Sequence, residues 1–70
     1  MQTGFAVLVT DEQDPHHGRA GRTLHVVERE GVGELVSVLL DGDDGTTDDE
    51  GNCPGATDFH ADQLAELGRI

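Results

Sequence analysis

The sequence predicts one small, mainly β domain with antiparallel strands. Three observations lead to this fold class: residues alternate in a two-residue pattern near the amino end, two β-branched runs flank a glycine-containing turn, and apolar residues return after a long polar segment. A chain of 70 residues buries only about 60% of its unfolded surface, so a single core has to stabilise the whole domain, residues 1–70.

The first strand is predicted near the amino end, where three large apolar residues alternate with three others: Phe5, Val7 and Val9 with Ala6, Leu8 and Thr10. Because side chains on a strand point to alternate faces, this pattern places one set on a buried face. The polar segment 11–18 follows, and its Pro15 and Gly18 predict a loop.

The second and third strands are predicted from two runs rich in Val and Leu, residues 23–28 and 34–41. The segment Gly31-Val32-Gly33 separates them. Glycine adopts the positive φ angles of tight hairpin turns, so the two runs predict a β-hairpin.

Residues 42–57 differ from the rest of the chain because they carry almost no apolar side chain. Such a segment contributes little to a core, so we expect a long, exposed, acidic loop with at most a short edge strand.

The segment 58–67 allows two interpretations. In the first, Thr57 or Asp58 caps a short helix that carries Ala61, Leu64 and Leu67 on one side. In the second, Phe59 lies on a strand, residues 62–64 form one helical turn, and residues 65–67 close the sheet. We favour the second interpretation, because three or four strands need another strand to close a barrel.

The charge of the chain is strongly negative. Fifteen acidic residues stand against four arginines and no lysine, which gives a net charge of −11 and a pI near 4.3. A GC-rich coding sequence and adaptation to high salt are both consistent with this composition. Six of the fifteen acidic residues lie in or beside the long polar loop: Asp41, Asp43, Asp44, Asp48, Asp49 and Glu50.

The expected location is the cytoplasm. Cys53 is the only cysteine, so it cannot form an internal disulfide, which fits a reducing compartment. The amino end has no basic segment, its apolar stretch is too short for a signal peptide, and nothing approaches the roughly 20 apolar residues that cross a membrane. We therefore expect no membrane association.

The residues that usually carry catalysis are scarce, and we expect neither an enzyme nor a cofactor. Without lysine there is no phosphate-binding loop of the Walker type and no Schiff base. Ser37 lies within an apolar strand, and Cys53 follows a run of acidic residues, an environment that does not activate a thiol. Catalytic residues are therefore not predicted.

Metal binding is also not expected. The segment 41–52 places glycine at position five and asparagine at position twelve, where a calcium loop of the EF-hand type needs an oxygen ligand and glutamate. His16 and His17, with Cys53 or His60, lack the usual spacing of metal ligands.

Taken together, the short strands, the glycine hairpin and the helical turn near the end resemble a small Src-homology-3-like barrel. Within it, residues 7–26 resemble the KOW motif of ribosomal proteins and transcription elongation factors. The matching positions are Val7, Val9, Gly18, Arg19, Gly21, Thr23 and Val26. A tight bend into the second strand of such a barrel needs glycine for positive φ or close backbone approach.

The resemblance implies a possible interaction site at Gly18, Arg19, Gly21 and Arg22. KOW domains that bind RNA present basic residues and an exposed aromatic ring, whereas this chain has a charge of −11 and two Phe in apolar patterns. An alternative is that both arginines pair with the acidic loops. We expect a non-enzymatic protein-interaction module whose hairpin edge or acidic loop binds another protein. The module is expected to be a monomer or a weak homodimer. The alternative is a KOW-like RNA-associated protein that uses the turn at Gly18–Arg22.

Overall fold

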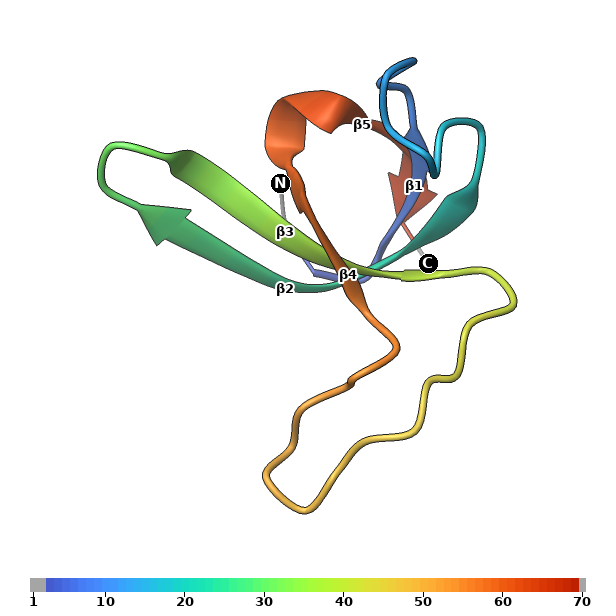
Figure 1. Cartoon of the computed structure of the whole chain (residues 1–70), viewed down its shortest axis with the longest axis vertical. Coiled ribbons are helices and arrows are strands. Elements are labelled where there is room, and N and C mark those ends of the chain that lie inside the picture. The colour runs from blue at the N-terminus through green and yellow to red at the C-terminus, as the bar shows by residue number, and fades with distance from the viewer. Residues whose placement is uncertain (1–2, 70) are drawn as a thin grey trace.

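The computed structural model describes residues 3–69, which form five strands and one turn of 3-10 helix (Figure 1). The elements are β1 (Phe5–Val9), β2 (Ala20–Arg29), β3 (Gly33–Leu40), β4 (Thr57–His60), η1 (Ala61–Gln63) and β5 (Leu64–Arg69). The part of the chain that the structure describes contains no helix with the length and apolar character needed to span a membrane.

The strands form one sheet in the order β4-β3-β2-β1-β5, and all four pairings are antiparallel. The prediction of a mainly β fold is therefore confirmed. β4 and β5 are the two edges of an open sheet, so the barrel expected from the sequence is not confirmed. The last strand returns to the free side of the first, where Val9 pairs with Leu64.

The core lies on one face of the sheet, and within residues 3–69 it contains seven buried apolar side chains: Val7, Val9, Val36, Val38, Leu40, Phe59 and Leu64. In β1 and β3 these residues alternate with half-buried ones, as the period-two pattern predicts. Thr23 is a polar residue that is also buried, and its Oγ1 accepts a hydrogen bond of 2.9 Å from the Phe5 N–H. The β2–β1 contact therefore includes a polar link within the core.

The predicted hairpin is formed by β2 and β3, and Figure 1 shows it projecting to one side of the sheet. The register shifts between Thr23 and His25. Thr23 is buried and Val26 packs against the core, although residues three positions apart on a regular strand point to opposite faces. The extra residue, Leu24, is therefore accommodated as a β-bulge. As a result His25 pairs with Ser37 on the face opposite the core, called the outer face below.

The carboxyl-terminal segment follows the second of the two interpretations. Phe59 is buried in β4, one turn of 3-10 helix follows, and β5 then pairs with β1. Gln63 stabilises this turn, because its Oε1 accepts the His60 N–H at 2.8 Å and its Nε2 donates to Asp11 Oδ2 at 2.8 Å. The alternative helix does not form, and Leu67 is an exposed strand residue.

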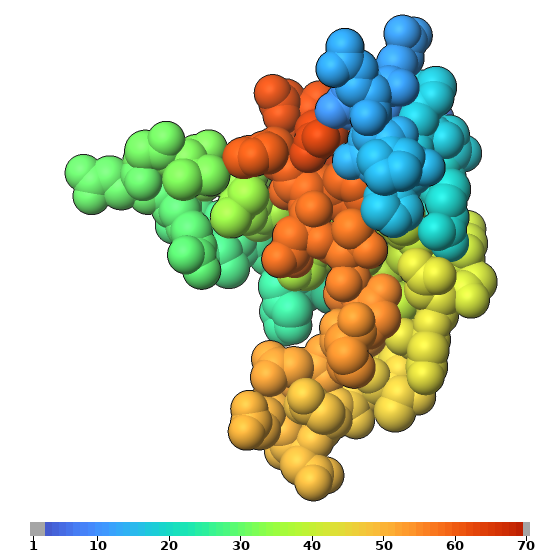
Figure 2. All heavy atoms as spheres, in the orientation of Figure 1, coloured from blue at the N-terminus to red at the C-terminus, as the bar shows by residue number. Residues whose placement is uncertain are grey.

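Two long loops connect the strands. Residues 10–19, between β1 and β2, are called the anchored loop, because hydrogen bonds join it to β1 and η1. Residues 41–56, between β3 and β4, are called the acidic arm. Figure 2 shows the arm as a lobe that projects from the strands, in yellow and orange. All residues from 41 to 52 are exposed.

Candidate functional site

The two glycines of the predicted interaction site have backbone roles. Gly18 has φ +85°, and its N–H donates to the Val9 carbonyl at 2.9 Å. Gly21 is buried in β2, and a Cβ there would lie 2.5 Å from the Leu39 carbonyl oxygen. Positive φ at the first glycine and close backbone approach at the second explain why this turn needs glycine.

The two arginines of the same turn do not form one basic surface. Arg19 Nη2 donates to the Asp41 carbonyl at 3.0 Å and lies 3.4 Å from Asp43 Oδ1, so this arginine is bound to the acidic arm. Arg22 is exposed in β2 between two core-facing residues and therefore points to the outer face. The carboxylate of Asp43 offsets the charge of Arg19, which weakens this turn as a site for anions.

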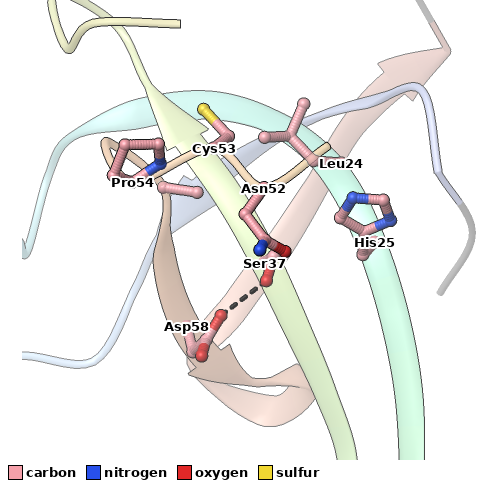
Figure 3. A pocket seen from close by; sticks show the side chains of 8 residues that line it. Leu24, His25, Ser37, Asn52, Cys53, Pro54 and Asp58 are labelled. Carbon is pink, nitrogen blue, oxygen red and sulfur yellow. Dashed lines mark hydrogen bonds between the residues drawn. The ribbon is translucent and has the colours of Figure 1, made fainter. Parts of the chain in front are cut away.

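A pocket with a volume of about 270 Å³ lies where the acidic arm returns to the outer face of the sheet (Figure 3). Its sheet side is formed by residues from three adjacent strands: Leu24, His25, Ser37 and Asp58. The end of the acidic arm forms its other side through Asn52, Cys53, Pro54 and Ala56. The pocket therefore combines polar groups of the sheet with apolar and amide groups of the arm.

Three polar side chains of this pocket form one row across the sheet. His25 in β2 pairs with Ser37 in β3, and Ser37 pairs with Asp58 in β4. The Ser37 hydroxyl donates to Asp58 Oδ1 at 2.5 Å, as the dashed line in Figure 3 shows. The hydrogen bond holds the carboxylate at a fixed place on the outer face.

The shape of the acidic arm is set by its own carboxylates. Asp44 Oδ1 accepts hydrogen bonds from the Thr46 hydroxyl at 2.6 Å and the Thr46 N–H at 2.9 Å, and these bonds lower the pKa of Asp44. Asp48 Oδ1 accepts from the N–H groups of Glu50 and Asn52 at 3.0 and 2.9 Å. Such turns give a loop a defined shape without a core.

The anchored loop uses its acidic residues differently. Asp11 accepts a hydrogen bond from the Gln63 side chain at 2.8 Å, and this bond is the largest cause of its lowered pKa. The His16 ring lies 2.9 Å from Asp14 Oδ1 and packs edge-on against Phe59, with ring centroids 5.7 Å apart. The anchored loop is thus bound to the rest of the fold by long-range contacts.

Within residues 3–69, no group of three or more His, Cys, Asp and Glu side chains is placed to hold a metal ion. His16 and His17 lie in the turns of the anchored loop rather than on a strand. Cys53 is half-buried in the acidic arm, and its Sγ lies 3.8 Å from the Asp44 carbonyl oxygen.

The outer-face row was not predicted from the sequence. The sequence marks Ser37 only as a residue of an apolar strand and Asp58 only as a candidate helix cap. The alternation of β3 does place Ser37 on the other face of the strand from Val36 and Val38, which indicates that its hydroxyl lies outside the core. The pairing of Ser37 with Asp58 depends on the register between β3 and β4, which residues 41–56 separate in the chain. No local pattern in the sequence specifies that register.

Comparison of the chain with protein-family models, with curated proteins and with solved structures gives no match.

Proposed function

We propose that this chain is a non-enzymatic protein-interaction module, a small Src-homology-3-like barrel that binds a basic segment of a partner protein through the acidic arm. The observation that carries the proposal is the charge of the arm. Six of the fifteen acidic residues lie in this projecting segment. Among residues 3–69 one of these six carboxylates, that of Asp43, lies within ion-pair distance of an arginine.

Binding through such an arm is electrostatic in character. Clustered charges of one sign attract a partner of the opposite sign and speed association, and salt weakens this effect. The turns at Asp44 and Asp48 already order the arm, which reduces the entropy that binding would cost. A basic, extended segment of another protein is the ligand that fits these properties.

The barrel in this proposal is supported by the helical turn η1 between the last two strands and by the glycines at 18 and 21. The same resemblance suggests RNA as an alternative ligand. The contact of Arg19 with Asp43 and the neighbouring carboxylates of the arm disfavour phosphate at that turn, because nucleic-acid affinity depends on neutralising phosphates.

Isothermal titration calorimetry with an arginine-rich peptide tests the proposal. The triple substitution Asp48→Asn, Asp49→Asn and Glu50→Gln removes charge from the arm. The control Glu28→Gln, Glu30→Gln and Glu66→Gln removes the same charge from exposed positions on β2, the hairpin turn and β5. We expect the arm variant to weaken binding about tenfold and the control less than about twofold.

Equal losses for the two triple variants would mean that only net charge matters, and absence of binding at low salt would refute the proposal. Filter binding with a structured RNA tests the alternative. Tight RNA binding that is lost in the variant Arg19→Glu, Arg22→Glu would replace the protein partner with RNA.

A further inference from the structure

The pocket between the outer face of the sheet and the end of the acidic arm has the chemistry of a cation site. The Asp58 carboxylate is its only charged acidic group among the described lining residues, and the arm before Asn52 adds Asp48, Asp49 and Glu50 nearby in the chain. The lining also contains the imidazole of His25, but an anionic ligand would be repelled by the Asp58 carboxylate and by the neighbouring carboxylates of the arm. The ligand therefore has to be neutral or positive.

The polar groups of the pocket favour a ligand with several N–H donors. Ser37 uses its hydroxyl hydrogen in the bond to Asp58 Oδ1, so its oxygen is left to accept. The second oxygen of Asp58 and the amide oxygen of Asn52 are further acceptors. A compact ammonium group carries three donors, whereas a planar guanidinium carries five in a fork that matches a carboxylate.

The other walls of the pocket suit an aliphatic stem. Figure 3 shows the Ser37–Asp58 pair toward one end of the pocket and Leu24 and Pro54 toward the other. The volume of about 270 Å³ compares with about 30 Å³ for each molecule of liquid water, so it has room for the end of a long side chain. An arginine side chain has apolar methylene groups behind its charged head.

We propose that this pocket binds the guanidinium group of an arginine side chain of the partner, with Asp58 as its charged acceptor. The inference rests on the proposed function, because it names the residue type in the basic segment that the pocket recognises. The acidic arm attracts the segment, and the Asp58 pocket selects arginine over lysine.

The test uses two peptides that differ only in arginine or lysine at each basic position, titrated at equal ionic strength. Wild-type protein is compared with Asp58→Asn and with the control Asp62→Asn, which removes the same charge from an exposed position in η1 outside this pocket. We expect wild type to bind the arginine peptide at least about fivefold more tightly, and Asp58→Asn to lose about tenfold in affinity for it. The Asp62→Asn control should lose less than about twofold.

A second measurement does not depend on a variant or on the partner. Nα-acetyl-arginine amide and Nα-acetyl-lysine amide are titrated into ¹⁵N-labelled protein, and amide chemical shifts are followed. Saturable shifts of Ser37, Asn52 and Asp58 with the arginine compound, and weaker ones with the lysine compound, would support the pocket.

The outcomes separate the two proposals. If both peptides bind equally and Asp58→Asn behaves like Asp62→Asn, the arginine pocket is wrong, while loss of binding in the arm triple variant would still support the proposed function. If the arginine compound shifts the pocket amides but no basic peptide binds, the proposal of an arginine pocket is supported and the proposed function is refuted. If neither compound shifts these amides, the pocket proposal is overturned.

Discussion

The anchored loop and the acidic arm share features of composition but have different relations to the sheet. Both are polar and acidic, and both contain proline and glycine. In the anchored loop, Asp11 binds Gln63 and His16 packs against Phe59, which lie more than forty residues further along the chain. In the acidic arm, Asp44 and Asp48 bind groups of the arm itself.

The difference shows what a carboxylate does in a small acidic fold. A carboxylate that accepts hydrogen bonds from a distant element stabilises the tertiary structure, whereas one that closes a local turn shapes a segment whose outer surface stays open to a partner. Stability is therefore expected to depend on the anchored loop and on the sheet it contacts, and binding on the acidic arm.

The largest effect is expected from Gly21, which lies against backbone in the sheet, and its matched comparison is Gly55, which lies against backbone in the arm. A Cβ at Gly21 would lie 2.5 Å from the Leu39 carbonyl oxygen, and one at Gly55 would lie 2.1 Å from that of Asp44. Gly21→Ala should lower the free energy of unfolding by at least about 2 kcal/mol, because the strands β2 and β3 have to move apart. Gly55→Ala should cost less than about 0.5 kcal/mol, because only the arm has to adjust.

Urea unfolding followed by circular dichroism measures both variants. A loss for Gly55→Ala as large as that for Gly21→Ala would mean that the arm unfolds together with the sheet, and the division between the two regions would not hold.

A smaller effect is expected from the hydrogen bonds of Gln63, which joins the anchored loop to η1. Gln63→Ala removes a donor to Asp11 and an acceptor of the His60 N–H, so the free energy of unfolding should fall by about 1 to 2 kcal/mol. The matched change in the arm, Thr46→Ala, removes a hydrogen bond to Asp44 and should cost less than about 0.5 kcal/mol. Thermal unfolding of both variants tests this, and similar losses would contradict it.

The strands could be predicted from the sequence because their information is local. The alternation around Val7 places β1. Gly31 in the hairpin turn and Gly33 at the first position of β3 have φ of +81° and +91°. A last strand after a helical turn is also predicted from the sequence and is present as β5, although it lies at the edge of an open sheet and does not close it. These features depend on side-chain periodicity and on glycine, which operate over a few residues.

The pocket could not be predicted because its residues meet through long-range register. The bulge at Leu24 shifts β2 by one residue, which turns His25 toward Ser37, and the pairing of β3 with β4 then adds Asp58. Neither the bulge nor the return of the arm has a local signal in the sequence. For Arg19 the sequence predicts only that its partner lies in an acidic loop. Which carboxylate it contacts, here that of Asp43, depends on the path of the arm.

The pH dependence of stability should distinguish Asp11 from Asp44, although hydrogen bonds lower the pKa of both. A carboxyl whose pKa is lowered by folding stabilises the fold above its ordinary pKa of 3.8, and this contribution is lost as pH falls toward the folded value. Asp11→Asn should therefore lower the melting temperature at pH 7, and its difference from wild type should shrink as the pH falls below about 4. Asp44→Asn should change the melting temperature less at every pH, since its bonds are local.

Melting curves between pH 2 and pH 7 provide this comparison. If Asp44→Asn is as destabilising as Asp11→Asn at neutral pH, the turns of the arm contribute to global stability and the distinction fails.

The smallest effect is expected where the two regions touch. Arg19 of the anchored loop lies 3.4 Å from Asp43 of the arm, and both side chains are more than a quarter exposed. Exposed ion pairs contribute little, so Arg19→Gln should change the free energy of unfolding by less than about 0.5 kcal/mol. The same variant should leave the ¹H–¹⁵N correlation spectrum of residues 10–18 largely unchanged. Such pairs contribute about 0.2–1 kcal/mol, so a larger loss in the free energy of unfolding, measured with urea, would contradict this expectation.

The most direct test of the account is a ¹H–¹⁵N correlation spectrum recorded while an arginine-rich peptide is added to the wild-type protein. The account predicts that amide shifts concentrate in residues 41–56 and at the outer-face residues Ser37 and Asp58, while residues 10–18 keep their positions. Shifts that concentrate in the anchored loop and at Gly18–Arg22, or a spectrum without shifts in the acidic arm, would contradict it.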